Sequence, residues 1–130
     1  MQTFLPISSL AGSAAILDYR RLGKQRVECM QLLKAIRTGG GWSNHPAAKM
    51  WVGYEEALET YMYHCIAEWT KRGYKNTMTA TLHPDCELPP WFGDVAFHAS
   101  HRSNLLRKDP AFYSVYNWVE PDDLPYIWPK

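Results

Sequence analysis

The sequence predicts an all-α protein, a single compact domain spanning residues 1–130 and built on three main helices. Two long stretches repeat apolar residues at spacings of three and four, as amphipathic helices do. No stretch alternates apolar and polar residues for long enough to form a sheet. With 130 residues, 46% of them hydrophobic, and six tryptophans, the chain suits one globular domain with a core of its own.

The chain is expected to open with an extended N-terminal arm, residues 1–12, because a proline interrupts this segment. A first helix then follows a cap at Ser9 or Ser13 and runs to about Arg37. Serine is a favoured N-cap, and the three consecutive glycines 39–41 are a strong stop signal.

The core-facing line of this first helix is unusual because its first half is polar. Burying a polar group costs about 1–3 kcal/mol unless it finds a partner. The residues on the line are Asp18, Leu22, Gln25, Arg26, Cys29, Leu33 and Ile36. Residues 17–28 are therefore the first place to look for a functional site. Gly23 costs a helix about 1 kcal/mol relative to alanine, so we expect another chain element or a ligand to approach the backbone there.

A second helix is predicted from Pro46, since proline suits the first position of a helix, to Lys71. Gly73 follows as a stop signal, and Gly53 is expected to kink the helix or divide it in two. Apolar residues recur along it at spacings of three and four: Trp51, Tyr54, Leu58, Tyr61, Cys65 and Trp69. This pattern is typical of a scaffold helix packed on a core.

The last third of the chain is predicted to combine a third main helix with irregular segments. Residues 74–94 contain three prolines and are expected to form a loop. The third helix is expected over Val95 to Lys108, and a short fourth one from Pro110 to Tyr116. Residues 118–130, with three further prolines and several aromatic residues, are expected to form a strap folded over the helices.

The overall charge excludes a uniformly basic surface for nucleic acids, because the formal net charge is only +1. The charges are unevenly distributed, however. Residues 18–37 hold six lysines and arginines against two acidic residues. One helix could therefore present a basic stripe on an otherwise balanced protein.

Cysteine usage and hydropathy favour a location in the cytoplasm. Cys29, Cys65 and Cys86 are odd in number and form no CxxC pair, which is typical of reduced thiols. The first residues carry no basic region like that of a signal peptide, and no apolar run approaches membrane-spanning length. We therefore expect a monomeric cytoplasmic protein that does not associate with membranes.

The first candidate site is the polar line of the first helix. Arg21, Gln25 and Glu28 share one stripe there, and Asp18 and Arg26 lie beside it. One interpretation is a salt-bridged helix face without a further role, because ion pairs often serve structure alone. The other is a site for a phosphate group or a base.

The second candidate site lies on the helix predicted over residues 95–108. Its phosphate-binding or base-reading side chains are His98, His101, Arg102, Asn104 and Arg107. The first three of these share one side of the helix. Histidine and arginine bind phosphate, and asparagine or arginine can read base edges.

A metal site is a third alternative. The residues that could form it are His83, Asp85, Cys86, His98 and His101. Their spacing matches no familiar zinc pattern. The glycines 39–41 lack the preceding strand and the following lysine of a phosphate-binding loop. We expect neither a metal ion nor another cofactor.

Three fragments of the chain have counterparts, in the same order and at nearly the same spacing, in one family of proteins. Tyr19-Arg20-Arg21-Leu22 is similar to a Tyr-Arg-Glu-Leu segment in that family's first helix. Residues 54–74, which end in Lys-Arg-Gly-Tyr, are similar to its long second helix, which ends in Lys-Arg-Gly-Phe. Its last third is matched by His98-Ala99-Ser100, Arg107, Pro110, Tyr113 and Tyr116. Together these fragments resemble the phage endonuclease V-like family of pyrimidine-dimer DNA glycosylases.

The resemblance implies an all-α domain of three principal helices, with the N-terminal segment threaded between them. It also implies a glycosylase coupled to an abasic-site lyase. In that chemistry the α-amino group of the chain attacks the sugar C1′, a Schiff base forms, and a carboxylate on the first helix assists. α-Amino groups in general titrate near neutrality and are therefore partly nucleophilic. A carboxylate can move protons and stabilise positive charge on the sugar.

Two positions depart from the family pattern. The catalytic glutamate aligns with Arg21, which can neither accept a proton at neutral pH nor stabilise a cation. Glu28, two turns along the same face, is the candidate substitute, with Gln25 as a helper. The family enzyme begins with threonine after removal of methionine, whereas the bulky Gln2 is expected to retain Met1, whose amine would then be the nucleophile. The basic positions that hold phosphates in the family are matched by Arg20, Lys24 and Arg107.

Two functions remain open at this point. The first is a DNA-repair glycosylase, with or without lyase activity, that flips a damaged or modified pyrimidine out of double-stranded DNA. The second is a non-catalytic or differently catalytic module that binds a nucleotide or modified base in the same cleft. Its binding residues would be Arg21, Gln25, Arg26, His101 and Asn104. Arginine at the position of the glutamate favours the second function, since a further cation suits an anionic ligand.

Overall fold

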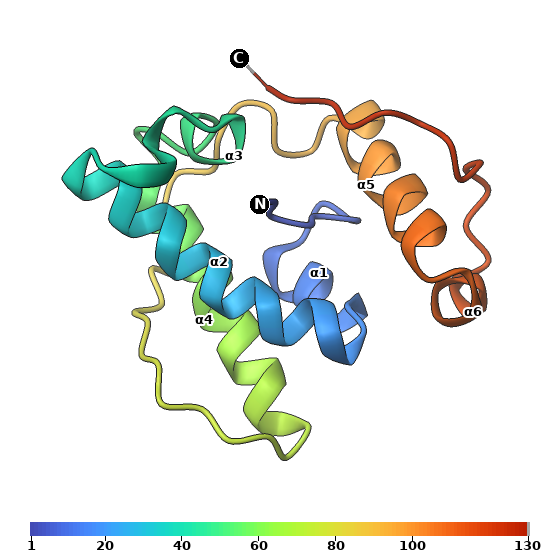
Figure 1. The fold of residues 1–130 in the computed structure, drawn as a ribbon, viewed down its shortest axis with the longest axis horizontal. Helices are drawn as coiled ribbons and strands as arrows, with labels where there is room; N and C mark the ends of the chain where they lie inside the picture. Colours follow the sequence, from blue (N-terminus) through green and yellow to red (C-terminus); the bar gives the residue numbers. More distant parts are fainter. Residues whose placement is uncertain (130) are drawn as a thin grey trace.

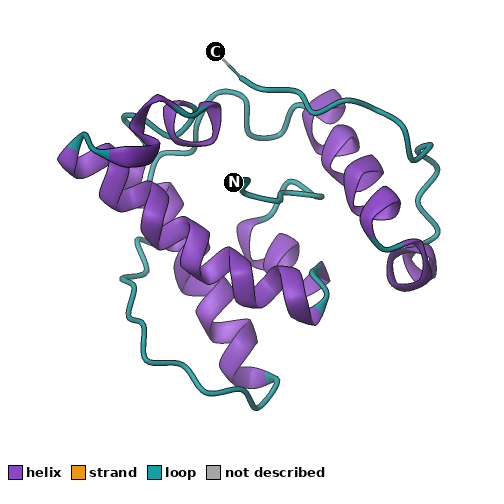
Figure 2. Ribbon diagram, viewed as in Figure 1, coloured by secondary structure: helices purple, strands orange, loops and turns teal. Residues whose placement is uncertain are grey.

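The computed structural model describes residues 1–129, which form six α-helices, two short 3-10 helices and no β-strand (Figures 1 and 2). The α-helices are α1 (Leu10–Ile16), α2 (Tyr19–Thr38), α3 (Pro46–Lys49), α4 (Glu55–Lys71), α5 (Val95–Lys108) and α6 (Pro110–Tyr113). The 3-10 helix η1 (Gly41–Asn44) precedes α3, and η2 (Ser114–Tyr116) follows α6. The predicted all-α fold with three main helices, here α2, α4 and α5, is confirmed. None of the helices within residues 1–129 is long and apolar enough to cross a membrane.

The first predicted helix is divided in two, because the chain turns at Leu17 and Asp18. The Ser9 hydroxyl caps α1 by accepting the N–H of Gly12 at 3.0 Å. Asp18 caps α2 in the same way, by accepting the N–H of Arg21. An aspartate with extended backbone is a favoured start for a helix. The single continuous helix was therefore wrong at this point, and the buried Asp18 is a cap.

The second predicted helix is also divided, at the glycine that the sequence singled out. Gly53 lies between α3 and α4 with a φ of 86°, a region that glycine adopts more readily than other residues. α2 packs along α4. Residues of both helices are buried in one apolar cluster, among them Cys29, Leu32, Leu33, Leu58, Tyr61 and Cys65.

Gly23 lies where α2 meets Trp69 of α4. A Cβ atom built on Gly23 would come within 2.9 Å of two ring carbons of Trp69. The close approach expected at this glycine is therefore made by another element of the chain. On the same side of α2, the Arg26 guanidinium carbon lies 4.3 Å from the Trp69 ring centroid.

The N-terminal arm lies between α2 and α5, as the family resemblance implied (Figure 1). Gln25 of α2 bonds to the arm on one side. On the other side, Leu5 donates its N–H to His101 Nδ1 at 2.9 Å, and its carbonyl lies 2.7 Å from His98 Nδ1. Side chains thus satisfy the buried backbone of a segment that has no secondary structure of its own.

The segment after η2 runs back along α5 as a strap (Figure 1). Leu124 donates its N–H to the Ser103 hydroxyl and accepts a bond from the Asn104 amide, each at 3.0 Å. Ile127 donates its N–H to the Ser100 hydroxyl at 3.3 Å. The predicted strap is confirmed over its described part; Lys130 lies outside the described residues.

Candidate active site

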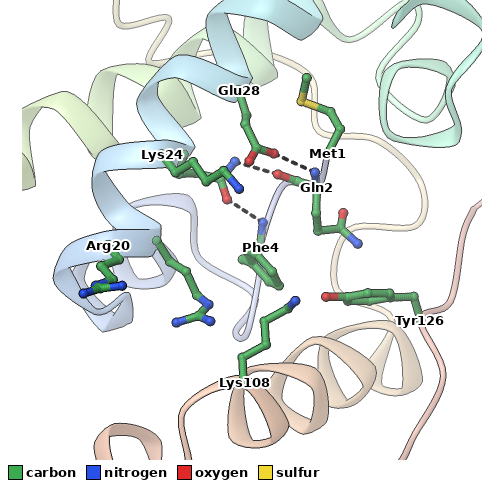
Figure 3. A pocket seen from close by; sticks show the side chains of 10 residues that line it. Met1, Gln2, Phe4, Arg20, Lys24, Glu28, Lys108 and Tyr126 are labelled. Carbon is green, nitrogen blue, oxygen red and sulfur yellow. Dashed lines mark hydrogen bonds between the residues drawn. The ribbon is translucent and has the colours of Figure 1, made fainter.

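A pocket of about 420 Å³ opens between α2, the N-terminal arm, the end of α5 and the strap (Figure 3). Its lining residues are Met1, Gln2, Phe4, Arg20, Arg21, Lys24, Gln25, Glu28, Lys108 and Tyr126. Four of these side chains are lysine or arginine, and one is a carboxylate. A cavity of this size holds a small molecule or one nucleotide unit, and its charges favour an anionic occupant.

Glu28 lies beside the start of the chain. Its Oε2 atom accepts a hydrogen bond from the backbone N–H of Gln2 at 2.8 Å. The α-amino nitrogen of Met1 is only a few covalent bonds from that N–H, and Met1 lines the same pocket (Figure 3). The arm therefore places an amine next to the one carboxylate of the pocket.

Gln25 fixes the arm in this position. Its amide nitrogen donates to the carbonyl of Gln2, and its amide oxygen accepts the N–H of Phe4, both at 2.8 Å. The side chain is only 2% exposed. Both ends of the amide are thus engaged by the arm, so Gln25 acts on the pocket by holding residues 2–4 in register.

Arg21 is held at the pocket by Asp18. Its Nη1 atom lies 3.2 Å from Asp18 Oδ1, and the Tyr113 hydroxyl donates to the same carboxylate oxygen. Burial by itself raises the pKa of Asp18, but the bonds from Tyr113 and Arg21 outweigh burial and hold this pKa below its usual value. Asp18 is therefore ionised at neutral pH and partly compensates the charge of Arg21.

The pocket brings together residues that the sequence singled out and residues that it did not. The predicted site residues that line it are Met1, Arg20, Arg21, Lys24, Gln25 and Glu28. Lys108 and Tyr126 line it as well and were missed. Lys108 could have been found as a basic residue in the last turn of a correctly predicted helix. Nothing in the sequence pointed to Tyr126, because the strap has no periodic pattern.

Arg26 lies on another side of α2, away from this pocket. Its Nη1 atom donates to Asn76 Oδ1 at 2.6 Å, and its guanidinium lies over the Trp69 ring. These contacts tie α2 to the end of α4 and the loop that follows it.

The two histidines of α5 do not line the pocket either, because both are buried against Leu5. Burial, with a smaller effect of neighbouring His98, lowers the pKa of His101 to about 3. Burial also lowers the pKa of His98, although the Leu5 carbonyl opposes the shift. Both rings are therefore neutral at physiological pH, which matches their partners: His101 Nδ1 accepts the N–H of Leu5, and His98 Nε2 accepts that of Gly93.

The remaining predicted residues of α5 bind other parts of the chain. Arg102 forms two hydrogen bonds of 2.8 Å with the Glu120 carboxylate and one with a carbonyl of the arm. Asn104 is buried, bonds to the strap and accepts a bond from Arg107. Arg107 also reaches the carbonyl of Asp122 at 3.5 Å. Residues 1–129 contain no cluster of three histidine, cysteine, aspartate or glutamate side chains that could hold a metal ion.

Comparison with known proteins gives one match. A family model described as pyrimidine dimer DNA glycosylase matches residues 1–82. The matched segment contains the arm, α2 and α4, whereas α5 and the strap lie beyond it. No curated protein and no solved structure matches the chain.

Proposed function

The chain belongs to the pyrimidine dimer DNA glycosylase family, and from this premise we propose that it excises a damaged or modified pyrimidine from double-stranded DNA. The nucleotide flips out of the duplex into the pocket, and the amine of Met1 is the nucleophile. The intermediate is a Schiff base, which also supports cleavage at an abasic site.

The hydrogen bond from Gln2 to Glu28, at 2.8 Å, is the observation that carries the proposal. It places a proton acceptor beside the amine that attacks. In the reaction the nitrogen of Met1 forms a bond to C1′ as the bond from C1′ to the base breaks. The base leaves with the electron pair and takes up a proton, while the amine gives a proton to Glu28. The same carboxylate stabilises the positive charge that develops on the sugar.

The cations around the pocket suit the phosphates that flank a flipped nucleotide. Arg20 and Lys24 come from the first turns of α2, and Lys108 comes from the end of α5 on the opposite side. Phosphate contacts of this kind position DNA without reading its sequence. Arg107, which the resemblance also assigned to phosphate, bonds to Asn104 and the strap in this structure.

Arg21 at the position of the family's glutamate is consistent with this chemistry because Glu28 supplies the carboxylate from further along α2. Asp18 offsets part of the Arg21 charge. Arg21 then serves as another phosphate contact at the edge of the pocket.

Borohydride trapping tests the proposal. Duplexes with an abasic site or with ultraviolet-damaged pyrimidines are incubated with the protein and reduced, and the adduct is mapped by peptide mass spectrometry. We expect the adduct on the α-nitrogen of Met1. The side-chain amines of Lys24 and Lys108 line the same pocket and are the alternatives that mapping distinguishes. The absence of both adduct and released base would refute the enzyme.

A nucleotide-binding module without catalysis is the second candidate, favoured by the pocket's four basic side chains against one carboxylate. A thermal-shift screen separates the two. Strong stabilisation by a free nucleotide, with no response to damaged duplexes, would support the binding module.

A further inference from the structure

The strap forms one wall of the pocket through Tyr126. Its hydroxyl is directed into the pocket, near Phe4 of the arm and the Lys108 amine (Figure 3). The hydrogen bonds that join the strap to α5 use the backbone of Leu124 and Ile127 and leave this hydroxyl for an occupant. The strap lies beyond the segment that matches the family, so the family assigns this wall no role.

A row of buried polar side chains on α5 fixes Tyr126 in place. Ser100, Ser103 and Asn104 are at most 1% exposed, and each bonds to the strap. These bonds hold the backbone at Leu124 and Ile127, on either side of Tyr126. Polar groups buried on a helix are costly unless paired, and this row is paired with the segment that carries the pocket's tyrosine.

The ring of Tyr126 is also supported from below. Its centroid lies 6.3 Å from that of Phe4 and 5.7 Å from that of His101, the latter in an edge-on arrangement. Burial raises the pKa of Tyr126 to about 12, an effect that Arg107 and Arg21 oppose and Glu28 reinforces. The hydroxyl therefore keeps its proton at physiological pH and can donate a hydrogen bond.

We propose that Tyr126 is a substrate-binding residue that donates a hydrogen bond to a carbonyl oxygen of the flipped pyrimidine. The identity of the ligand rests on the proposed function. Phe4 and Tyr126 form the aromatic side of the pocket, which suits a base, whereas Arg20, Lys24 and Lys108 suit its phosphates. As the base leaves with the electron pair of its bond to C1′, negative charge develops on its carbonyl oxygens. A fixed donor there favours departure, because its bond strengthens as the charge grows.

The variant Tyr126→Phe tests this proposal, since it removes the hydroxyl and keeps the ring. We expect base release in a single turnover to slow about 10-fold. Lyase cleavage of a duplex with a preformed abasic site should stay within about 2-fold of wild type, because that substrate has no base to contact. Tyr63→Phe, an exposed tyrosine on α4, is the matched control.

The comparison of the two steps decides the outcome. An unchanged rate of base release, or an equal loss in base release and lyase cleavage, would overturn the role of Tyr126. Lys108→Gln should slow both steps, because both substrates carry the phosphates.

A binding measurement keeps the inference separate from the proposed catalysis. If the wild-type protein neither releases a base nor forms an adduct, thermal shifts are measured with thymidine 5′-monophosphate and with 2-deoxyribose 5-phosphate. Tyr126→Phe should reduce the shift given by the first compound and not that given by the second. Equal shifts in wild type and variant for both compounds would refute the contact with the base.

Discussion

The polar side chains of α2 and those of α5 look alike in the sequence and have different roles in the fold. On α2, Gln25 holds the arm, and Glu28 beside it faces a pocket otherwise lined by cations. On α5, His98, His101 and Asn104 are buried and bonded to the arm or the strap. One helix therefore supplies a candidate active site, and the other holds that site together.

The difference teaches how to interpret a buried polar residue on a helix. Such a residue indicates that something other than an apolar core packs there, and this can be a ligand or irregular backbone that needs partners. The partners decide between the two. Both polar ends of Gln25 are bonded within the chain, whereas Glu28 holds one backbone N–H and still lines an open pocket.

The largest effect is expected from Glu28→Gln, which tests the α2 side of the comparison. The amide oxygen can still accept the N–H of Gln2, so the arm should stay in place, while the proton acceptor is lost. We expect trapped adduct to form about 100-fold more slowly, with a Tm close to that of wild type. Glu56→Gln on α4 is the control, because that side chain is 67% exposed. A rate near that of wild type would exclude Glu28 from the chemistry.

The acid dependence of stability tests the α5 side. Burial lowers the pKa of His101 to about 3 and lowers that of His98 as well. Between pH 6.5 and 3 the unfolded chain therefore binds protons that the folded chain does not, so stability is full above this window and falls as the pH decreases. Urea unfolding should show a loss of about 2 kcal/mol from His101 alone between pH 7 and 5. A flat profile would contradict the burial of neutral rings.

Removing cations should affect the two helices differently. In the double variant Arg20→Ala with Lys24→Ala, DNA affinity should fall about 10-fold and lose about one unit of salt slope per phosphate contact. Arg102→Ala on α5 should leave that slope unchanged and lower the unfolding free energy by about 1–3 kcal/mol, because Glu120 loses its partner. Binding titrations at several salt concentrations, with urea unfolding, measure both. A changed slope for Arg102→Ala would place that residue on the DNA.

The smallest effect is expected from Gly23→Ala, on a side of α2 that faces α4. The added Cβ would lie 2.9 Å from Trp69, so we expect a net loss of about 1 kcal/mol despite the better helix propensity of alanine. In a Trp69→Leu background the same change should be neutral or stabilising. Urea unfolding of the four proteins tests this, and equal effects in both backgrounds would exclude the ring as the cause.

Local sequence rules predicted the helices well where a cap or a stop residue is decisive. α5 covers the predicted range from Val95 to Lys108, and α2 ends at the predicted glycines. The break at Asp18 was missed because the apolar period continues across it from Leu17 to Leu22. An aspartate can be a core-facing residue or a cap, and its backbone conformation, which periodicity does not report, decides between them.

The sequence by itself determined the helical class, the strap, and the segment of α2 that carries one side of the candidate site, because these depend on periodicity and on costly polar residues in a buried line. Only the tertiary structure decided which polar residues face a pocket and which bind the chain. The arm and the strap have no regular pattern, and their paths are set by hydrogen bonds to distant side chains, as Leu5 is to His101 and Leu124 is to Ser103. Those long-range bonds bring Met1 to Glu28 and Tyr126 to the opposite wall, so the complete pocket exists only in the folded chain.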